Sequence, residues 1–134
     1  MTAQANPDGL VLQASHHDPA KTMERLIAAV TARGMSVFAR IDHAAAAASA
    51  GLTLRPTEVL IFGNAKAGTP LMQSAQTTGI DLPLKALVFE NGEGKTCIAY
   101  NNPKWIAARH GAVAVDGVLE TMTATLAAVV QEAI

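Results

Sequence analysis

Residues 59–70 read VLIFGNAKAGTP, and this segment decides the fold. Its first four residues are apolar without alternation, which predicts a central strand over Thr57–Phe62 that is covered on both faces. The apolar run stops at Gly63 and continues into a small polar loop. We expect the Thr69 side chain to cap a helix that Pro70 opens, ending near residue 79. The segment therefore predicts a strand, a tight connection and a new helix.

Two further strands are predicted before this segment, at Leu10–Ala14 and Ser36–Asp42. The helix between them starts at Asp18-Pro19 and stops before Gly34. Its apolar residues recur at i, i+3, i+4 and i+7, which indicates one buried face: Met23, Leu26, Ile27 and Val30. A short alanine-rich helix over 44–50, with Asp42 as its cap, follows the second strand.

After the segment, residues 84–90 and 96–100 are predicted strands joined by the turn Asn91–Gly94. A short helical turn is expected over Pro103–Trp105. The last helix carries a sustained apolar stripe from Val115 to Val130. The close hairpin requires an antiparallel pair, so a fully parallel nucleotide-binding sheet is not expected.

These elements predict an α+β fold, with one mainly antiparallel sheet and two long helices packed on one face. We expect a flexible N-terminus over residues 1–8 and a single α+β domain over residues 9–134. The first nine residues lack the features of a secretory signal, and no apolar stretch approaches the roughly 20 residues of a membrane span. With Cys97 as the single cysteine, no internal disulfide can form, so a cytoplasmic protein is expected.

The composition also narrows the partners. Of the 134 residues, 50% are apolar and 16% are charged, and the formal net charge is −1. This balance provides no general attraction to nucleic acid or to anionic lipid, so neither is expected as a partner. An antiparallel sheet covered by helices on one face leaves a second apolar face, and a homodimer is expected to bury it.

Five short motifs follow one another in a specific order: IDHAA at 41–45, LRPTE at 54–58, FGNAKAGTP at 62–70, DLPLK at 81–85 and YNNP at 100–103. Through them, roughly residues 9–132 resemble the domain of unknown function 302 family. The resemblance implies a compact strand–helix–four-strand–helix fold, similar in outline to the TATA-binding-protein type. The family pattern usually has proline where this chain has Ala65, which leaves the loop less rigid. The resemblance implies no activity.

The junction after Phe62 is the leading candidate site. Gly63 and Gly68 have the spacing of a phosphate-binding P-loop, but Thr69 stands where that motif requires lysine. Lys66 lies inside the loop and can reach an anion at the start of the helix. In the alternative interpretation the two glycines only make turns, Thr69 only caps the helix and Lys66 is solvated.

Asp42 and His43 are expected near this junction. His43 is either a partly exposed residue after a capping Asp42 or a general acid or base. His16 and His17 point to opposite sides of an extended chain, and no chelating spacing exists elsewhere, so neither a metal nor a cofactor is expected. Cys97 is expected to be a buried, inert thiol.

The function that these residues favour is binding of a polar or anionic small molecule by a small non-catalytic domain that forms a homodimer. The ligand-binding set comprises Asp42, His43, Asn64, Lys66, Gly68, Thr69 and Lys85. The alternative is an enzyme in which His43 is the acid or base while Lys66 or Asn64 stabilises negative charge.

Overall fold

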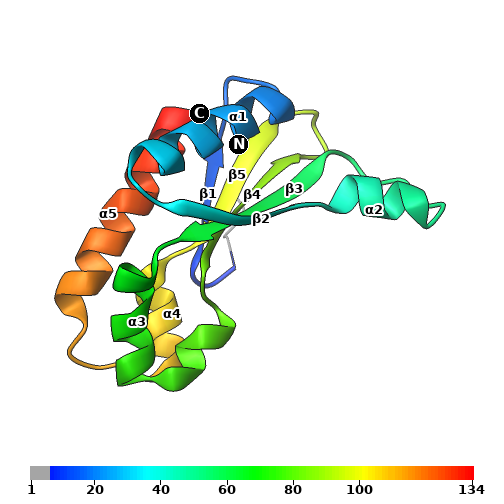
Figure 1. Cartoon of the computed structure of the whole chain (residues 1–134). Coiled ribbons are helices and arrows are strands. Elements are labelled where there is room, and N and C mark those ends of the chain that lie inside the picture. Colours follow the sequence, from blue (N-terminus) through cyan, green and yellow to red (C-terminus); the bar gives the residue numbers. More distant parts are fainter. Residues whose placement is uncertain (1–6) are drawn as a thin grey trace.

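The sheet has five strands in the order β1-β5-β4-β3-β2, and every neighbouring pair is antiparallel. The computed structural model in Figure 1 describes residues 7–134, so most of the N-terminal segment expected to be flexible lies outside the described residues. The strands are β1 (Leu10–Ala14), β2 (Ser36–Asp42), β3 (Thr57–Gly63), β4 (Leu84–Glu90) and β5 (Thr96–Asn101). The α+β class and the mainly antiparallel sheet predicted from the sequence are confirmed.

The helices are α1 (Pro19–Ala32), α2 (His43–Ser49), α3 (Ala65–Ser74), α4 (Pro103–His110) and α5 (Asp116–Ala133). A short 3₁₀ helix, η1 (Gln76–Ile80), follows α3. The expected start of α1 is present, since the Asp18 carboxylate accepts a hydrogen bond from the Lys21 N–H at 2.7 Å. Within residues 7–134, no helix combines the length and the apolar character needed to cross a membrane.

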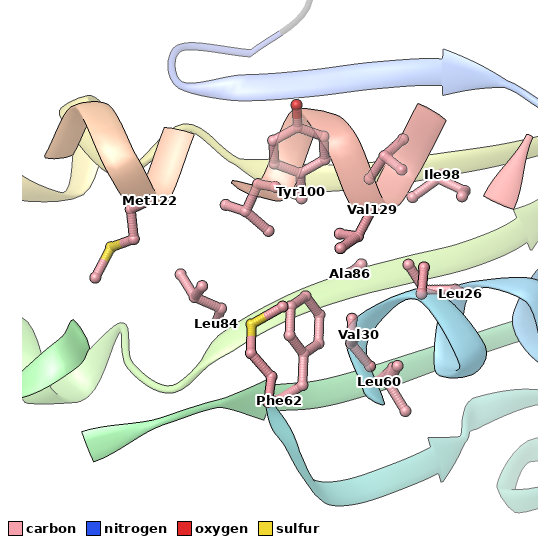
Figure 2. Close-up of a cluster of buried hydrophobic side chains, with 14 of the residues drawn as sticks. Leu26, Val30, Leu60, Phe62, Leu84, Ala86, Ile98, Tyr100, Met122 and Val129 are labelled. Carbon is pink, nitrogen blue, oxygen red and sulfur yellow. The ribbon is translucent and has the colours of Figure 1, made fainter. Parts of the chain in front are cut away.

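The core lies between one face of the sheet and the helices α1 and α5, which pack against each other. Figure 2 shows strand side chains such as Leu60 and Phe62 directed toward Leu26 and Val30 of α1. These four side chains are completely buried. Burying each one contributes about 1.5–3 kcal/mol. The apolar periodicity of the helices is therefore satisfied by one face of the sheet.

The opposite face of the sheet is also apolar, but its larger side chains remain partly accessible. Val59 and Ile61 point to this face from β3 because they alternate with the buried Leu60 and Phe62. Both are only half-buried, so β3 is an interior strand without the expected cover on both faces. The same face carries these residues of neighbouring strands: Leu12, Ile41, Leu87 and Phe89.

The helix after the junction begins earlier than the sequence predicts. The Asn64 side chain, and not Thr69, caps α3, because Asn64 Oδ1 accepts a hydrogen bond from the Ala67 N–H at 2.8 Å. Thr69 and Pro70 therefore lie inside the helix. Asparagine is an effective cap when its own backbone is extended, as it is here. The predicted Thr69 cap is wrong, and the polar loop is the first turn of α3.

The short helix α2 projects from the end of the β2–β3 hairpin, away from the rest of the molecule (Figure 1). Its N-terminus is capped as expected, since Asp42 Oδ1 accepts a hydrogen bond from the Ala45 N–H at 2.9 Å. None of its residues is buried. The helix is thus capped by a neighbouring residue, but its alanine side chains do not pack into the core.

Candidate functional site

A cavity of about 210 Å³ lies where β3 ends and α3 begins. Its polar lining comes from Asn64 and Thr69, and Gly68 leaves space on the same side. The remaining lining is mainly apolar and comes from β2, α3, the segment before β4, the start of β4, and α5: Phe38, Met72, Leu82, Leu84 and Met122. The junction selected from the sequence therefore borders a cavity. The lining of this cavity is mainly apolar, whereas the sequence predicted a polar site.

A wider hollow of about 890 Å³ adjoins this cavity. The two share lining residues from four parts of the chain: Met35, Asn64, Ala67, Leu84 and Met122. The hollow adds two cationic side chains, Arg33 and Lys66. An apolar space and a space bordered by two cations therefore lie side by side at this end of the molecule.

The polar side chains at this end differ in whether they already form hydrogen bonds or ion pairs within the protein. Asn64 Oδ1 is occupied by the helix cap, which leaves its amide Nδ2 as the group that can donate outward. Arg33 forms an ion pair with Glu132, with 3.3 Å between Nη2 and Oε2. Lys66 is exposed and has no ion-pair partner within residues 7–134. Lys66 is therefore the freer cation for an incoming anion.

Asp42 and His43 lie at the other end of the hairpin from this cavity. In the register of β2 and β3, Ser36 faces Gly63 whereas Asp42 faces Glu58. At about 3.3 Å per residue along β2, His43 lies about 20 Å from the junction. The sequence interpretation placed these residues near Asn64 and Lys66, and the structure does not bring them together.

Lys85 is also directed elsewhere. Its Nζ donates hydrogen bonds to the carbonyl oxygens of Asp81 and Pro83, at 3.3 and 3.0 Å. In the sheet it is paired with Ile61, on the face away from α1 and α5. Lys85 therefore steadies the segment that leads into β4 and does not line the cavity. The structure gathers Asn64, Lys66, Gly68 and Thr69 from the predicted set.

One polar cluster was not found from the sequence. The Asp81 carboxylate accepts hydrogen bonds from Arg109 Nη1 at 2.8 and 2.9 Å, and its Oδ2 lies 2.5 Å from His110 Nε2. The other ring nitrogen of His110, Nδ1, is 2.8 Å from the Thr77 hydroxyl. These contacts tie the end of α4 to the segment that contains η1. The basic pair also lies in the last turn of α4, where positive charge is favourable.

The environment of Asp81 sets its pKa. Partial burial opposes ionisation of the carboxyl, but the hydrogen bonds from His110 and Arg109 outweigh it, and the pKa is lowered. The Thr77–His110–Asp81 order resembles that of a hydrolytic triad. None of the three residues lines the cavity beside Asn64. The cluster is therefore best understood as a clamp between α4 and the chain before β4.

Within the described part of the chain, no group of three or more His, Cys, Asp and Glu side chains is placed to hold a metal ion. Cys97 is buried, and this burial raises the pKa of its thiol. The Asn91 amide donates a long hydrogen bond to its Sγ at 3.7 Å. These features are typical of a structural cysteine in a strand.

Curated relatives share part of their length with this chain. The chain is 51% identical over 102 residues to the fluoride-specific ion channel FluC 1 of Brucella suis biovar 1 (strain 1330), and equally identical to FluC 1 of Brucella abortus biovar 1 (strain 9-941). The matches cover 76% of this chain but only 40% and 38% of those proteins. The channel activity in their names is thus that of proteins with considerably more sequence.

A solved structure matches the fold almost completely. It is the crystal structure of an uncharacterised conserved DUF302 protein from Bacillus stearothermophilus, with a TM-score of 0.85 over 96% of this chain and 100% of that one. The sequence identity is 19%, so this likeness concerns the fold alone. The family model for the domain of unknown function DUF302 matches residues 11–132. The resemblance seen in the motifs is confirmed, and the chain belongs to the DUF302 family.

Proposed function

We propose that this domain binds a polar or anionic small molecule at the end of β3, with Asn64, Lys66, Gly68 and Thr69 as its ligand-binding residues. The observation that carries the proposal is the cavity at this junction, which adjoins a hollow lined by Lys66 and Arg33. A concave site with few polar groups is the usual form of a small-molecule site.

The helix α3 adds to the attraction for negative charge. Its first N–H groups have no partners within the helix, and the Asn64 side chain satisfies the one on Ala67. The remaining N–H groups and the aligned peptide dipoles favour an anion near this terminus. Lys66 lies on the same first turn, so the charge of its side chain acts in the same direction.

Binding without catalysis is the better-supported form of this proposal. The enzymatic alternative needs the His43 imidazole within hydrogen-bond reach of a group at the junction. The strand register separates His43 from Lys66 by most of the length of β2. We assign the binding to the cytoplasm, because the single cysteine leaves the domain independent of an oxidising compartment.

A thermal-shift panel tests this proposal. The panel comprises phosphate, sulfate, fluoride, nucleotides and small carboxylates, with fluoride included because the Brucella relatives are named as fluoride channels. A ligand at 100 times its Kd should stabilise the protein by about 2.7 kcal/mol. The variant Lys66→Ala/Thr69→Ala should lose this stabilisation while its circular dichroism spectrum stays unchanged.

The matched control is Lys104→Ala, which removes an exposed lysine from α4 that lines neither the cavity nor the hollow. It should respond to the ligand as the unaltered protein does. Equal stabilisation of the double variant would contradict the proposed site. Loss of stabilisation in Lys104→Ala as well would show that the response depends on overall charge.

We also propose that two copies of the domain associate through the open face of the sheet. Leu12 and Ile41 are 40% and 42% exposed on this face although both are large and apolar. Val59, Ile61 and Leu87 lie between them and are half-buried. Exposed contiguous apolar surface of this kind is typical of an interface.

The open face is large enough to provide more than half of one side of a standard interface with a second copy. A face of five strands, at about 4.8 Å per strand and about six residues long, covers on the order of 500 Å². Standard interfaces bury about 800 Å² per partner. The segment after α2 carries two further exposed apolar residues, Leu52 and Leu54, which are 67% and 47% exposed.

Analytical ultracentrifugation at micromolar concentration tests the homodimer. The variant Leu12→Glu/Ile41→Glu places two like charges on the open face and should sediment as a monomer. Ile80→Glu is the matched control, because Ile80 is 75% exposed on η1, outside the sheet. A dimer that persists in the double variant, or an unaltered protein that is monomeric at this concentration, would contradict the proposal.

A further inference from the structure

The cavity beside Asn64 and the hollow beside Lys66 offer different chemistry to a single ligand. The cavity is lined mainly by apolar side chains, and the hollow is lined by the two cations, Arg33 and Lys66. A small hydrophilic anion would use only the hollow. The two spaces adjoin at Met35, Leu84 and Met122, which line both, so a ligand with two parts can use both.

We infer that the ligand is an amphiphilic anion, a carboxylate on a small aromatic or branched apolar group, with the apolar group in the cavity and the carboxylate facing Lys66. This inference rests on the proposed function, because it assigns a ligand class to the same site.

The cavity volume sets the size of the apolar group. An apolar cavity of about 150 Å³ accepts a benzene ring. The cavity here is about 210 Å³, so a ring with one or two additional carbon atoms fits. A nucleotide base with its sugar, or a long acyl chain, exceeds this space.

The walls suit an apolar group of irregular shape. Three methionines line the cavity: Met35 just before β2, Met72 in α3 and Met122 in α5. Thioether side chains adapt readily to ligands of different shape. Phe38 also lines the cavity although it is 56% exposed. It is the residue that an irregularity in β2 leaves without a partner in β3. Such bulges redirect side chains next to binding sites.

The charges favour a carboxylate at the other end. Lys66 has no acidic partner among the described residues, whereas Arg33 is partly compensated by Glu132. Asn64 borders both spaces, and because its Oδ1 caps α3, its amide nitrogen is the neutral donor available there. A carboxylate accepts from an ammonium and an amide together, and charge-assisted hydrogen bonds are the stronger ones.

Isothermal titration with three probes tests the inference: phenylacetate, its neutral analogue phenylacetamide, and acetate. The unaltered protein should bind phenylacetate at least tenfold more tightly than either of the others. In Lys66→Gln, phenylacetate should bind about tenfold more weakly, the effect of one charge-assisted contact, while phenylacetamide is unaffected. Lys104→Gln should leave all three affinities unchanged.

A second variant tests the apolar part. A Cβ at position 68 would lie 3.7 Å from Leu82 Cδ1 and 4.0 Å from Met72 Cε, so Gly68→Ala is accommodated without a clash. Gly68→Leu extends the side chain into the cavity and should abolish binding of phenylacetate and phenylacetamide. Gly68→Ala should weaken the binding of both probes only modestly. It serves as the control for the loss of glycine itself, since its side chain does not fill the cavity.

The outcomes distinguish this inference from the proposed function. If acetate and phosphate bind through Lys66 and phenylacetate binds no more tightly than acetate, the inferred ligand class is wrong and the proposed anion site is supported. If phenylacetamide binds as well as phenylacetate and Lys66→Gln changes neither, the anionic part is overturned. If no probe and no member of the thermal-shift panel binds, both proposals fail.

Discussion

At the residue scale, Gly9 and Trp105 hold the start of β1 against α4. A Cβ at Gly9 would lie 2.2 Å from the Trp105 ring atom Cγ, and the φ of Gly9 is +77°. The Gly9 carbonyl also accepts a hydrogen bond from the Asn102 N–H at 2.7 Å. Close approach and backbone conformation both require glycine at this position.

Gly9→Ala should therefore lower the free energy of unfolding by roughly 2–4 kcal/mol, from backbone strain and from displacement of the ring. Gly34→Ala is the matched control, since Gly34 has a φ of +76° but nothing within 4 Å of the place that a Cβ would take. It should cost only the strain, about 1–2 kcal/mol. Urea unfolding measures both, and equal losses would contradict the proposed clash.

Asp81 makes a pH-dependent contribution to stability. The pKa of Asp81 is lower in the folded protein than in the unfolded chain, so in acid the unfolded chain binds more protons. The contribution is therefore fully present at pH values above the unfolded pKa of the carboxyl. The contribution should disappear as the pH falls below about 4 and through the folded value. Unfolding by urea across this range should show a steeper acid loss for the unaltered protein than for Asp81→Asn. Parallel curves for the two proteins would show that Asp81 makes no pH-dependent contribution to the free energy of unfolding.

At the scale of elements, the start of α3 distinguishes the sequence prediction from the structure. Asn64→Ala should lower the free energy of unfolding by about 1 kcal/mol because it removes the cap. Thr69→Ala should cost little, since Thr69 is exposed inside the helix and alanine has the higher helix propensity. Chemical denaturation of the two variants provides the comparison. A larger loss for Thr69→Ala would support the cap predicted from the sequence.

The helix α2 connects the element scale to association. A helix of seven residues with none buried is too short to persist strongly by itself. If the proposed homodimer covers it, its amide protons should exchange more slowly as protein concentration rises. In Leu12→Glu/Ile41→Glu the exchange should be fast at every concentration. Hydrogen exchange that is slow and independent of concentration in both proteins would contradict this role.

At the scale of the whole molecule, the sheet separates a covered face from an open one. The proposed dimerisation through the open face would make the melting temperature depend on protein concentration, because association stabilises only the folded state. The Tm of the unaltered protein should therefore rise over a hundredfold increase in concentration. The Tm of Leu12→Glu/Ile41→Glu should stay constant, and Ile80→Glu should behave like the unaltered protein.

Several features of this protein follow from the sequence itself. The strands at 10–14 and 36–42, the hairpin at 84–101 and the long C-terminal helix depend on local periodicity and turn residues, which act within a few neighbours. The family membership also follows from the ordered motifs. The capping role of Asn64 was missed because both Asn64 and Thr69 are good caps by residue type, and only backbone geometry chooses between them.

The tertiary structure alone decided which distant groups meet. Arg109 and His110 reach Asp81 across 28 and 29 residues of sequence, and no local pattern predicts that contact. His43 and Lys66 are only 23 positions apart, yet the antiparallel register places them at opposite ends of β2. Side chains from β2, α3 and α5 enclose the apolar cavity. Short-range preferences determine elements, whereas proximity in space depends on how the completed sheet and helices pack.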